Sequence, residues 1–375
     1  DGYDRARDRL YQRDDDGGDD DSGDGAGERE LQAFAKSFTG CPPPDQKVTD
    51  AVGNWGDGHA AGEAGGDKRV VVLVHGYAWG QRDPGQAVLD GDPYATIYAD
   101  PDSLPEDKRI QSWLPMTGRA PVVGFAWTSD PDFFEYAEAC WSNPYEYAVQ
   151  DLAPLAGQAL ATLIRALSDA GLTVDLLAHS LGTRTAVKAL DRLAGEERYR
   201  NAVRRAVMMG GAEYSVDALA TAARVGTDFY NFAIREDGVL SWGAAELGGS
   251  HRPNNSMLSR VIGLDGVKRR ANWLDLQLDH QDRASREEFR RWFDKLHGYR
   301  LSGDPAAGRG RHWAYFLNEG NRELITHLFD KPNYSVEWLR DRGCPDGVER
   351  FRYDALRGQP PKPLMTCKAR KAATG

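Results

Sequence analysis

The apolar positions of this chain follow two patterns that alternate along it. Short apolar runs predict strands, and the continuous β-branched run at 69–74 is typical of a strand buried on both faces of a parallel sheet. These runs cover 69–74, 121–127, 172–178, 205–209, 227–234 and 273–278. Apolar residues recur at helical spacing over 145–168, 183–190, 216–223, 286–296 and 319–329. Strands that alternate with helices predict an α/β fold with a mostly parallel, doubly wound sheet flanked by helices.

The segments outside this alternation suggest the domain organisation. The acidic stretch 14–24 holds no apolar residue, which predicts a disordered tail. The segment Val48–Val52 is a candidate for a first edge strand. We expect a disordered tail over residues 1–45, an α/β catalytic domain over 46–335 and a C-terminal extension over 336–375. Two long polar segments, 78–118 and 279–311, are expected to be cap- or lid-like inserts near the site.

Charge and hydropathy narrow the possible partners. Residues 1–30 carry a net charge of −7, out of −10 for all 375 residues, so the body of the chain is close to neutral. No basic patch predicts a nucleic-acid partner, and no apolar run approaches the ~20 residues that span a bilayer. We expect a soluble protein, located in the cytoplasm or secreted to the periplasm or beyond. The sequence makes no prediction about the number of subunits.

The cysteines show no metal-binding spacing. Cys41, Cys140, Cys344 and Cys367 contain no C-x-x-C pair. Two disulfides and four buried thiols are both compatible with this count, and Cys344 with Cys367 is the easiest pair to propose. We expect no metal and no organic cofactor.

The candidate nucleophile is Ser180. It lies between a predicted strand and a predicted helix, in the stretch Ala-His-Ser-Leu-Gly at 178–182. A serine on so tight a turn needs small residues two positions before and two after it, here Ala178 and Gly182. The turn raises the hydroxyl above the sheet at a helix N-terminus, where N–H groups favour negative charge. An ordinary serine N-cap is the simpler alternative.

A second motif supports the catalytic interpretation. The strand at 69–74 ends in His75-Gly76-Tyr77. In folds built around such an elbow, the loop after this strand supplies one oxyanion N–H, and the residue after the nucleophile supplies the other. The predicted donors are the backbone amides of Tyr77 and Leu181.

A serine nucleophile needs a histidine base and an acid that orients the histidine. The expected chain order is serine, acid, histidine. Asp237 follows the strand at 227–234 and is the preferred acid, with Glu213 and Glu236 as rivals. His312 lies after the last predicted strand and is the preferred base, with His280 as its main rival.

These motifs together resemble a bacterial branch of the α/β-hydrolase superfamily, of esterase and lipase type, whose members mostly lack an assigned substrate. The matching pieces are the strand-His-Gly at 70–76, Phe-Ala-Trp-Thr-Ser at 125–129, the helix before the elbow, His-Ser-Leu-Gly-Thr-Arg at 179–184, Asp-Gly-Val-Leu at 237–240 and His-Trp-Ala-Tyr-Phe at 312–316. The resemblance covers residues 68–330 and implies the α/β-hydrolase fold with Ser180, Asp237 and His312 as its triad. Thr128 replaces the proline that is usual in this branch.

The expected reaction is hydrolysis of a small-molecule or lipid carboxylic ester through an acyl-enzyme on Ser180. An amidase, peptidase or acyltransferase could use the same triad. A protein of another class, a non-catalytic binder of a lipid or partner, is the remaining alternative. Aromatic residues near the expected site suggest an apolar substrate, and the tentative substrate-binding residues are Trp79, Trp127, Phe133 and Trp242.

Overall fold

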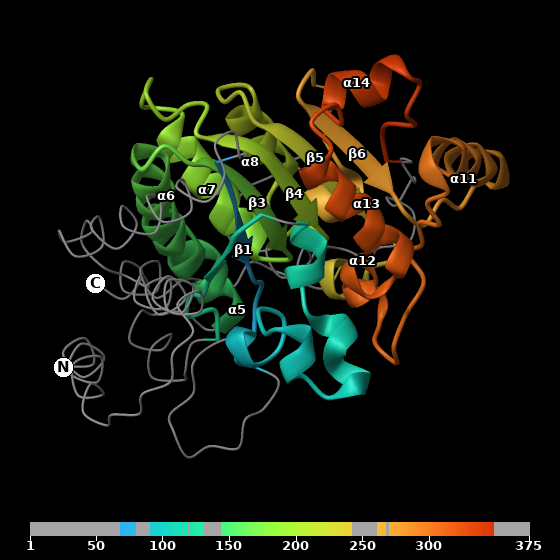
Figure 1. The fold of residues 1–375 in the computed structure, drawn as a ribbon, viewed down its shortest axis with the longest axis horizontal. Coiled ribbons are helices and arrows are strands. Elements are labelled where there is room, and N and C mark those ends of the chain that lie inside the picture. Colours follow the sequence, from blue (N-terminus) through green and yellow to red (C-terminus); the bar gives the residue numbers. More distant parts are fainter. Residues whose placement is uncertain are drawn as a thin grey trace, which may run out of the picture.

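The computed structural model describes residues 68–79, 91–118, 120–130, 144–241, 261–267 and 270–348. Within these ranges one six-stranded sheet has the order β2-β1-β3-β4-β5-β6, and every neighbouring pair is parallel (Figure 1). The strands are β1 (Arg69–Val74), β2 (Val122–Phe125), β3 (Thr173–His179), β4 (Val203–Met209), β5 (Asp228–Ala233) and β6 (Trp273–Gln277). The predicted α/β fold class is confirmed. The strand predicted at 48–52 lies outside the described residues.

The centre of the sheet explains its continuous apolar runs. All six residues of β1 are buried. Val70, Val72 and Val74 pack into the core on one face, whereas Val71 and Leu73 pack into the core on the other. Such a strand shows no polar alternation because helices cover both faces of a parallel sheet.

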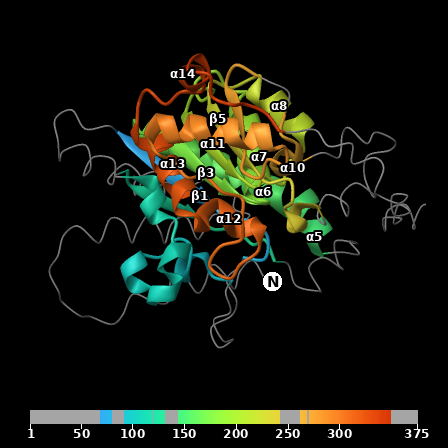
Figure 2. The same cartoon turned by 90° about the vertical axis from the view of Figure 1, so that its right-hand side faces the viewer.

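Helices cover the two faces of the sheet as separate layers (Figures 1 and 2). The Val70 face packs against α6 (Ala153–Asp169), α7 (Gly182–Leu193) and α8 (Ser215–Ala222). The Leu73 face packs against α11 (Arg283–His297), α13 (Glu319–Asp330) and α14 (Val336–Asp341). The helices predicted from periodicity are therefore present. Residues 336–341, at the start of the predicted C-terminal extension, pack onto the core through Val336 and Leu339. The boundaries of the domains remain predictions.

The helix predicted over 145–168 is divided into three parts. It consists of α5 (Pro144–Tyr147), a π-helical turn η5 (Ala148–Leu152) and α6. The Val149 carbonyl in the π turn accepts a hydrogen bond of 2.8 Å from Arg184 Nε, so the turn is tied to α7. Leu155, one of the apolar residues at helical spacing over 145–168, is 48% exposed, so this position of the predicted apolar face does not lie in the core.

Short helical segments make up much of the remaining structure. They are η1 (Pro93–Ala95), η2 (Pro101–Ser103), η3 (Glu106–Gln111), η4 (Leu114–Thr117), α10 (Ile262–Asp265), η6 (Arg311–Trp313) and α12 (Ala314–Leu317). The first four belong to the predicted insert at 78–118. The last two precede α13, and η6 carries His312.

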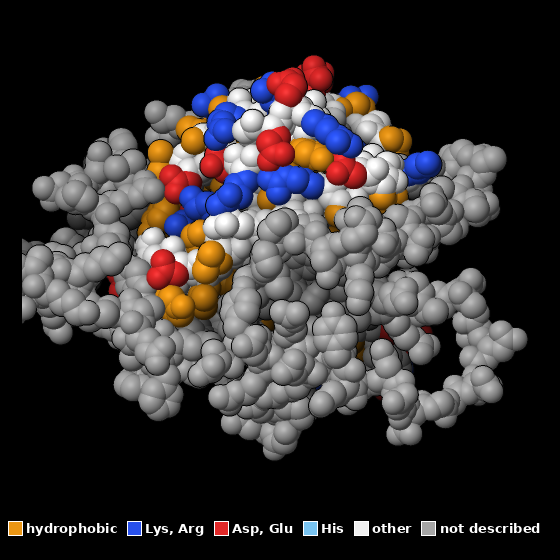
Figure 3. All heavy atoms as spheres, turned by 90° about the vertical axis from the view of Figure 1, so that its left-hand side faces the viewer, with side chains coloured by type: hydrophobic (Ala, Val, Ile, Leu, Met, Phe, Trp, Pro, Cys, Tyr) orange, Lys and Arg blue, Asp and Glu red, His pale blue; other side chains and the backbone are white. Residues whose placement is uncertain are grey.

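The described surface on the α6 side mixes charges of both signs (Figure 3). Ion pairs there include Arg165 with Glu196 at 2.5 Å and Arg198 with Asp169 at 2.6 Å. None of the helices in the described ranges combines the length and apolarity that crossing a membrane requires.

Candidate active site

Ser180 occupies a strained turn between β3 and α7. Its φ of 52° lies in the left-handed region, which is uncommon for a residue other than glycine and is the conformation of a nucleophile elbow. A Cβ on Gly182 would lie 2.3 Å from the His75 carbonyl oxygen. Glycine is therefore required two positions after Ser180, because α7 begins directly against the end of β1.

The loop after β1 also lies against Ser180. A Cβ on Gly76 would stand 2.7 Å from Ser180 Cβ and 3.3 Å from its Oγ. Tyr77, a predicted oxyanion donor, is the next residue of this loop. Leu181, the other predicted donor, is the N-cap of α7, where the first N–H groups have no partner within the helix.

Trp127 and Ser129 hold this loop in place. The Trp127 amide N–H donates to His75 Nε2 at 3.0 Å, and the indole N–H donates to the His75 carbonyl at 3.0 Å. Ser129 Oγ lies 2.8 Å from the Gly76 carbonyl and accepts the Trp79 N–H at 3.0 Å. The 125–129 motif thus positions the backbone next to Ser180.

The ring of His75 is neutral within this arrangement. Burial lowers the pKa of His75 to about 4, although a hydrogen bond to the Gly76 carbonyl opposes the shift. Because Nε2 accepts the Trp127 amide, the ring proton resides on Nδ1 and is donated to Gly76 at 2.9 Å. A neutral ring here adds no charge beside the candidate nucleophile.

Asp237 and His312 form a buried pair on the other side of the site. His312 Nδ1 donates to Asp237 Oδ2 over 2.7 Å, and Tyr315 Oη donates to the same oxygen over 3.1 Å. The other carboxylate oxygen accepts the N–H groups of Val239 and Leu240 at 3.0 and 3.1 Å. Both carboxylate oxygens of Asp237 therefore accept hydrogen bonds, which fixes the carboxylate. The bond to Nδ1 orients the His312 ring and leaves its Nε2 for another partner.

The environment of Asp237 favours its charged form. Burial alone raises the pKa of this carboxyl, but the attraction of His312 and the hydrogen bonds from His312, Leu240 and Tyr315 outweigh it. The pKa is consequently lowered. An ionised acid holds the tautomer that a serine hydrolase needs, with the proton on Nδ1.

His179 connects Ser180 to the histidine. Its Nε2 lies 2.9 Å from the His312 carbonyl oxygen, and the two ring centroids are 4.6 Å apart. Burial, with repulsion from His312, lowers the pKa of His179 to about 3, so the ring is neutral and donates from Nε2. In the described part of the chain no hydrogen bond joins Ser180 Oγ to the His312 ring; such contacts often tighten only when substrate binds.

The rival acids and the rival base are engaged elsewhere. Glu213 is fully buried, and its Oε1 lies 2.5 Å from Arg184 while Oε2 lies 3.5 Å from Lys188. Glu236 pairs with Arg311 at 3.0 Å. The ring of His280 packs 4.9 Å from that of Phe289, next to β6. None of these residues is brought to the Asp237–His312 pair by a contact in the described structure.

A small cavity of about 170 Å³ is lined in part by Tyr77 and Trp313, which neighbour Gly76 and His312 in sequence, while Ser180, Asp237 and His312 are not among its lining residues. Its lining is largely aromatic and apolar with two polar side chains, and comprises Tyr77, Ala78, Trp79, Ile97, Gln111, Arg309, Trp313, Phe316 and Leu317. A larger hollow of about 430 Å³ beside α13 contains none of the predicted site residues.

The four tentative substrate-binding residues have different outcomes. Trp79 lines the small cavity. Trp127 is only 2% exposed and is used to hold His75. Phe133 and Trp242 lie outside the described residues. The structure adds residues that the sequence analysis did not select, Tyr315 and Trp313, which are part of the same His-Trp-Ala-Tyr-Phe motif as His312.

The parallel sheet and the strained serine between β3 and α7 define the class of protein, an α/β-hydrolase fold. Residues 63–222 match the model of a protein family described as "Alpha/beta hydrolase of unknown function (DUF900)". Over these residues the chain is similar to that family, and its six-stranded parallel sheet flanked by helices is consistent with the α/β-hydrolase fold. No curated protein and no solved structure matches the chain. The matched segment contains Ser180 and ends before Asp237 and His312.

Proposed function

We propose that this protein is a serine hydrolase that cleaves carboxylic esters through an acyl-enzyme on Ser180. The observation that carries the proposal is the buried hydrogen bond of 2.7 Å between His312 and Asp237, in a pair linked through His179 to the serine elbow. The similarity of residues 63–222 to a hydrolase family supports an enzyme, and the largely aromatic and apolar lining of the small cavity supports an apolar acyl or aryl group in the substrate.

In the proposed reaction Ser180 Oγ attacks the ester carbonyl while His312 Nε2 takes its proton. The ionised Asp237 holds Nδ1–H and stabilises the imidazolium that forms. The amides of Tyr77 and Leu181 donate to the oxyanion of the tetrahedral intermediate. His312 then protonates the leaving alcohol, and water activated by the same ring releases the carboxylic acid and frees Ser180.

The cavity suggests the size of the substrate. Its volume of about 170 Å³ lies below the ~300–1,000 Å³ of sites that enclose drug-sized ligands. Aromatic rings of Trp79, Trp313 and Phe316 form much of the lining. We therefore expect esters with a short acyl or single-ring aryl group to react faster than long-chain lipids.

The test combines covalent labelling with turnover. A fluorophosphonate probe should label the wild-type protein and not Ser180→Ala, and hydrolysis of aryl acetates should fall roughly 10⁴-fold or more in that variant. Ser215→Ala is the matched control, because Ser215 also begins a helix after a strand but donates to the Gly266 carbonyl at 2.6 Å. The control variant should label and turn over normally.

Each alternative function has a distinct outcome in this test. Folded wild-type protein that neither labels nor hydrolyses any ester would refute the enzyme and favour a binding protein. Labelling without ester turnover, followed by cleavage of anilides, would indicate an amidase or peptidase. Transfer of the acyl group to added alcohols or amines in preference to water would indicate an acyltransferase.

A further inference from the structure

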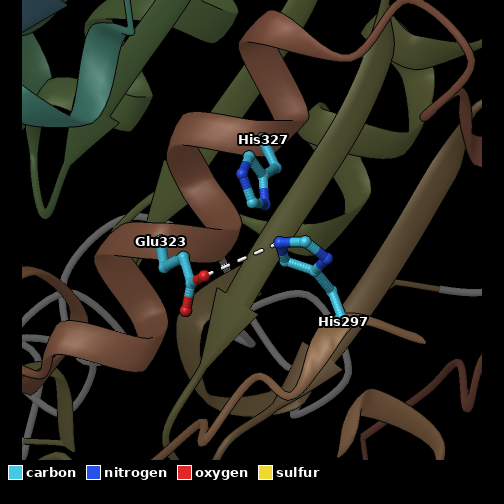
Figure 4. Close-up of side chains that lie close together, drawn as sticks. All are labelled: His297, Glu323 and His327. Atoms are coloured by element: carbon cyan, nitrogen blue, oxygen red, sulfur yellow. Dashed lines mark ion pairs between the residues drawn. The ribbon is translucent and has the colours of Figure 1, made fainter. Parts of the chain in front are cut away.

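Three side chains with metal-ligating atoms converge on the face of the molecule where α11 ends beside α13 (Figure 4). They are His297, Glu323 and His327, and one ligand atom from each lies within 4.8 Å of the others. His297 Nε2 lies 3.8 Å from Glu323 Oε1, and the two imidazole centroids are 4.6 Å apart. None of these residues takes part in the candidate active site.

Local structure brings the three side chains together. Glu323 and His327 are four residues apart on α13, so they share one face of that helix. His297 is the last residue of α11, and Gly298 follows with φ 80°. This left-handed residue turns the chain back, so that His297 and Tyr299 both lie against His327, with ring centroids at 4.6 and 5.6 Å.

A second set of contacts orients one of the rings. Tyr299 Oη lies 2.5 Å from His327 Nδ1, and the Tyr299 hydroxyl can in turn donate to Tyr334 Oη at 3.4 Å. The tautomer with the proton on His327 Nδ1 is the one that lets the Tyr299 hydroxyl accept from His327 and donate onward to Tyr334, and it leaves the Nε2 lone pair for an ion. Metal-binding histidines commonly have their second nitrogen held in this way. The alternative to a metal site is a weak surface ion pair between His297 and Glu323. Such a pair would require neither His327 nor the hydrogen bond with Tyr299 that orients its ring.

We propose that His297, Glu323 and His327 bind one divalent transition-metal ion of the zinc type. Two imidazoles and one carboxylate form a ligand set that zinc accepts, with water completing the tetrahedron. Ligand atoms around zinc stand about 3.4 Å apart. His297 and Glu323 are 44% and 49% exposed and free to close that distance by rotation. The 430 Å³ hollow that includes Glu323 gives solvent access.

The ion would join the 279–311 segment to α13, the long helix that follows the proposed base His312. His297 ends the helix of the 279–311 segment, and Glu323 lies in the second turn of α13. Between these two ligands the chain runs through η6, which contains His312, and through α12. A bound ion therefore closes residues 298–322 into a loop, and it favours the folded state over chains in which the ligands are apart. This inference does not depend on the proposed hydrolase activity.

The test is a zinc titration of the full chain after treatment with a chelator. Calorimetry should show one Zn²⁺ equivalent bound, and saturating Zn²⁺ should raise the Tm by several degrees. His297→Ala, Glu323→Gln and His327→Ala should each weaken binding roughly tenfold or more and remove the rise in Tm. Tyr299→Phe should weaken binding by about 10- to 100-fold, as expected for a group that orients a ligand.

Glu287→Gln is the matched control for Glu323→Gln. Glu287 lies on α11 and pairs at 2.9 Å with the exposed Arg283, away from the two histidines. This variant should bind Zn²⁺ as the wild type does. The proposal is overturned if the wild type binds no Zn²⁺ up to millimolar concentration, or if His297→Ala and Glu323→Gln bind it unchanged, which would assign the ion to other residues. His297 and Glu323 are exposed enough for both variants to fold.

Discussion

The two halves of the candidate site are held in place by different forces. Around Ser180 the backbone is fixed by packing, since Gly76 and Gly182 each leave no room for a Cβ. Around His312 the structure is fixed by hydrogen bonds to polar groups, mainly those of Asp237 and His179. The first half should be sensitive to added volume and the second to lost charge. Three substitutions, at Asp237, Gly182 and Tyr315, test this contrast, and Glu213→Gln and Gly238→Ala serve as comparisons.

The largest effect is expected at Asp237. Asp237→Asn keeps the volume but removes the charge that holds the His312 tautomer, and the corresponding change in other serine hydrolases costs about 10⁴-fold in kcat, or roughly 5 kcal/mol. Ester turnover and urea unfolding should be measured on the same preparation. The expected result is a folded protein with little turnover.

Glu213→Gln provides the comparison for that substitution. Glu213 is a buried partner of Arg184, and removal of one partner of a buried ion pair costs roughly 3–5 kcal/mol of stability. The kcat of the folded fraction should stay within about tenfold of the wild type. If Glu213→Gln abolishes turnover while Asp237→Asn does not, the acid is assigned to the wrong residue.

A smaller effect, on stability, is expected at Gly182. Gly182→Ala places a Cβ 2.3 Å from a backbone oxygen that cannot rotate away, and overpacking of this kind costs about 3 kcal/mol. Gly238→Ala is the control, because a Cβ there meets nothing within 4 Å. Chemical denaturation should separate the two variants. Equal stabilities would contradict the idea that packing fixes the serine turn.

The smallest effect is expected at Tyr315. Tyr315→Phe removes one hydrogen bond to the Asp237 carboxylate, worth roughly 1.5–3 kcal/mol for a charged acceptor. The folded pKa of Asp237 is lowered, so its stabilisation is present above the unfolded pKa and is lost as the pH falls through the folded value. The variant should therefore be less stable than wild type at pH 7, with the difference shrinking below about pH 4. A difference independent of pH would show that the hydroxyl acts through packing.

The fold could be predicted from the sequence because each strand carries its own signal. The β1 run of valines needs two covering layers, and helical periodicity supplied those layers. What periodicity could not reveal is where a helix is interrupted or which apolar residue stays exposed. The π turn over 148–152 is tied to Arg184, a neighbour distant in sequence, and nothing in the spacing of Leu155 distinguishes it from the buried residues of the same helix.

The candidate site was less accessible to sequence reasoning than the fold. Glu213 and Asp237 each follow a strand, and only their partners in space distinguish them. Trp127 was selected as an aromatic near the substrate, whereas its two N–H groups are used by His75. The His297–Glu323–His327 cluster was missed because only a Glu-x-x-x-His spacing is visible along the chain, and the third ligand comes from another helix.

The hydrogen bond from His179 reaches the backbone of His312 and not its ring. Under the proposed mechanism, replacing the imidazole at position 312 would remove the proton transfer but leave this hydrogen bond, because the anchoring carbonyl belongs to whatever residue is there. The proposed chemistry and the anchoring of the loop would therefore be lost separately.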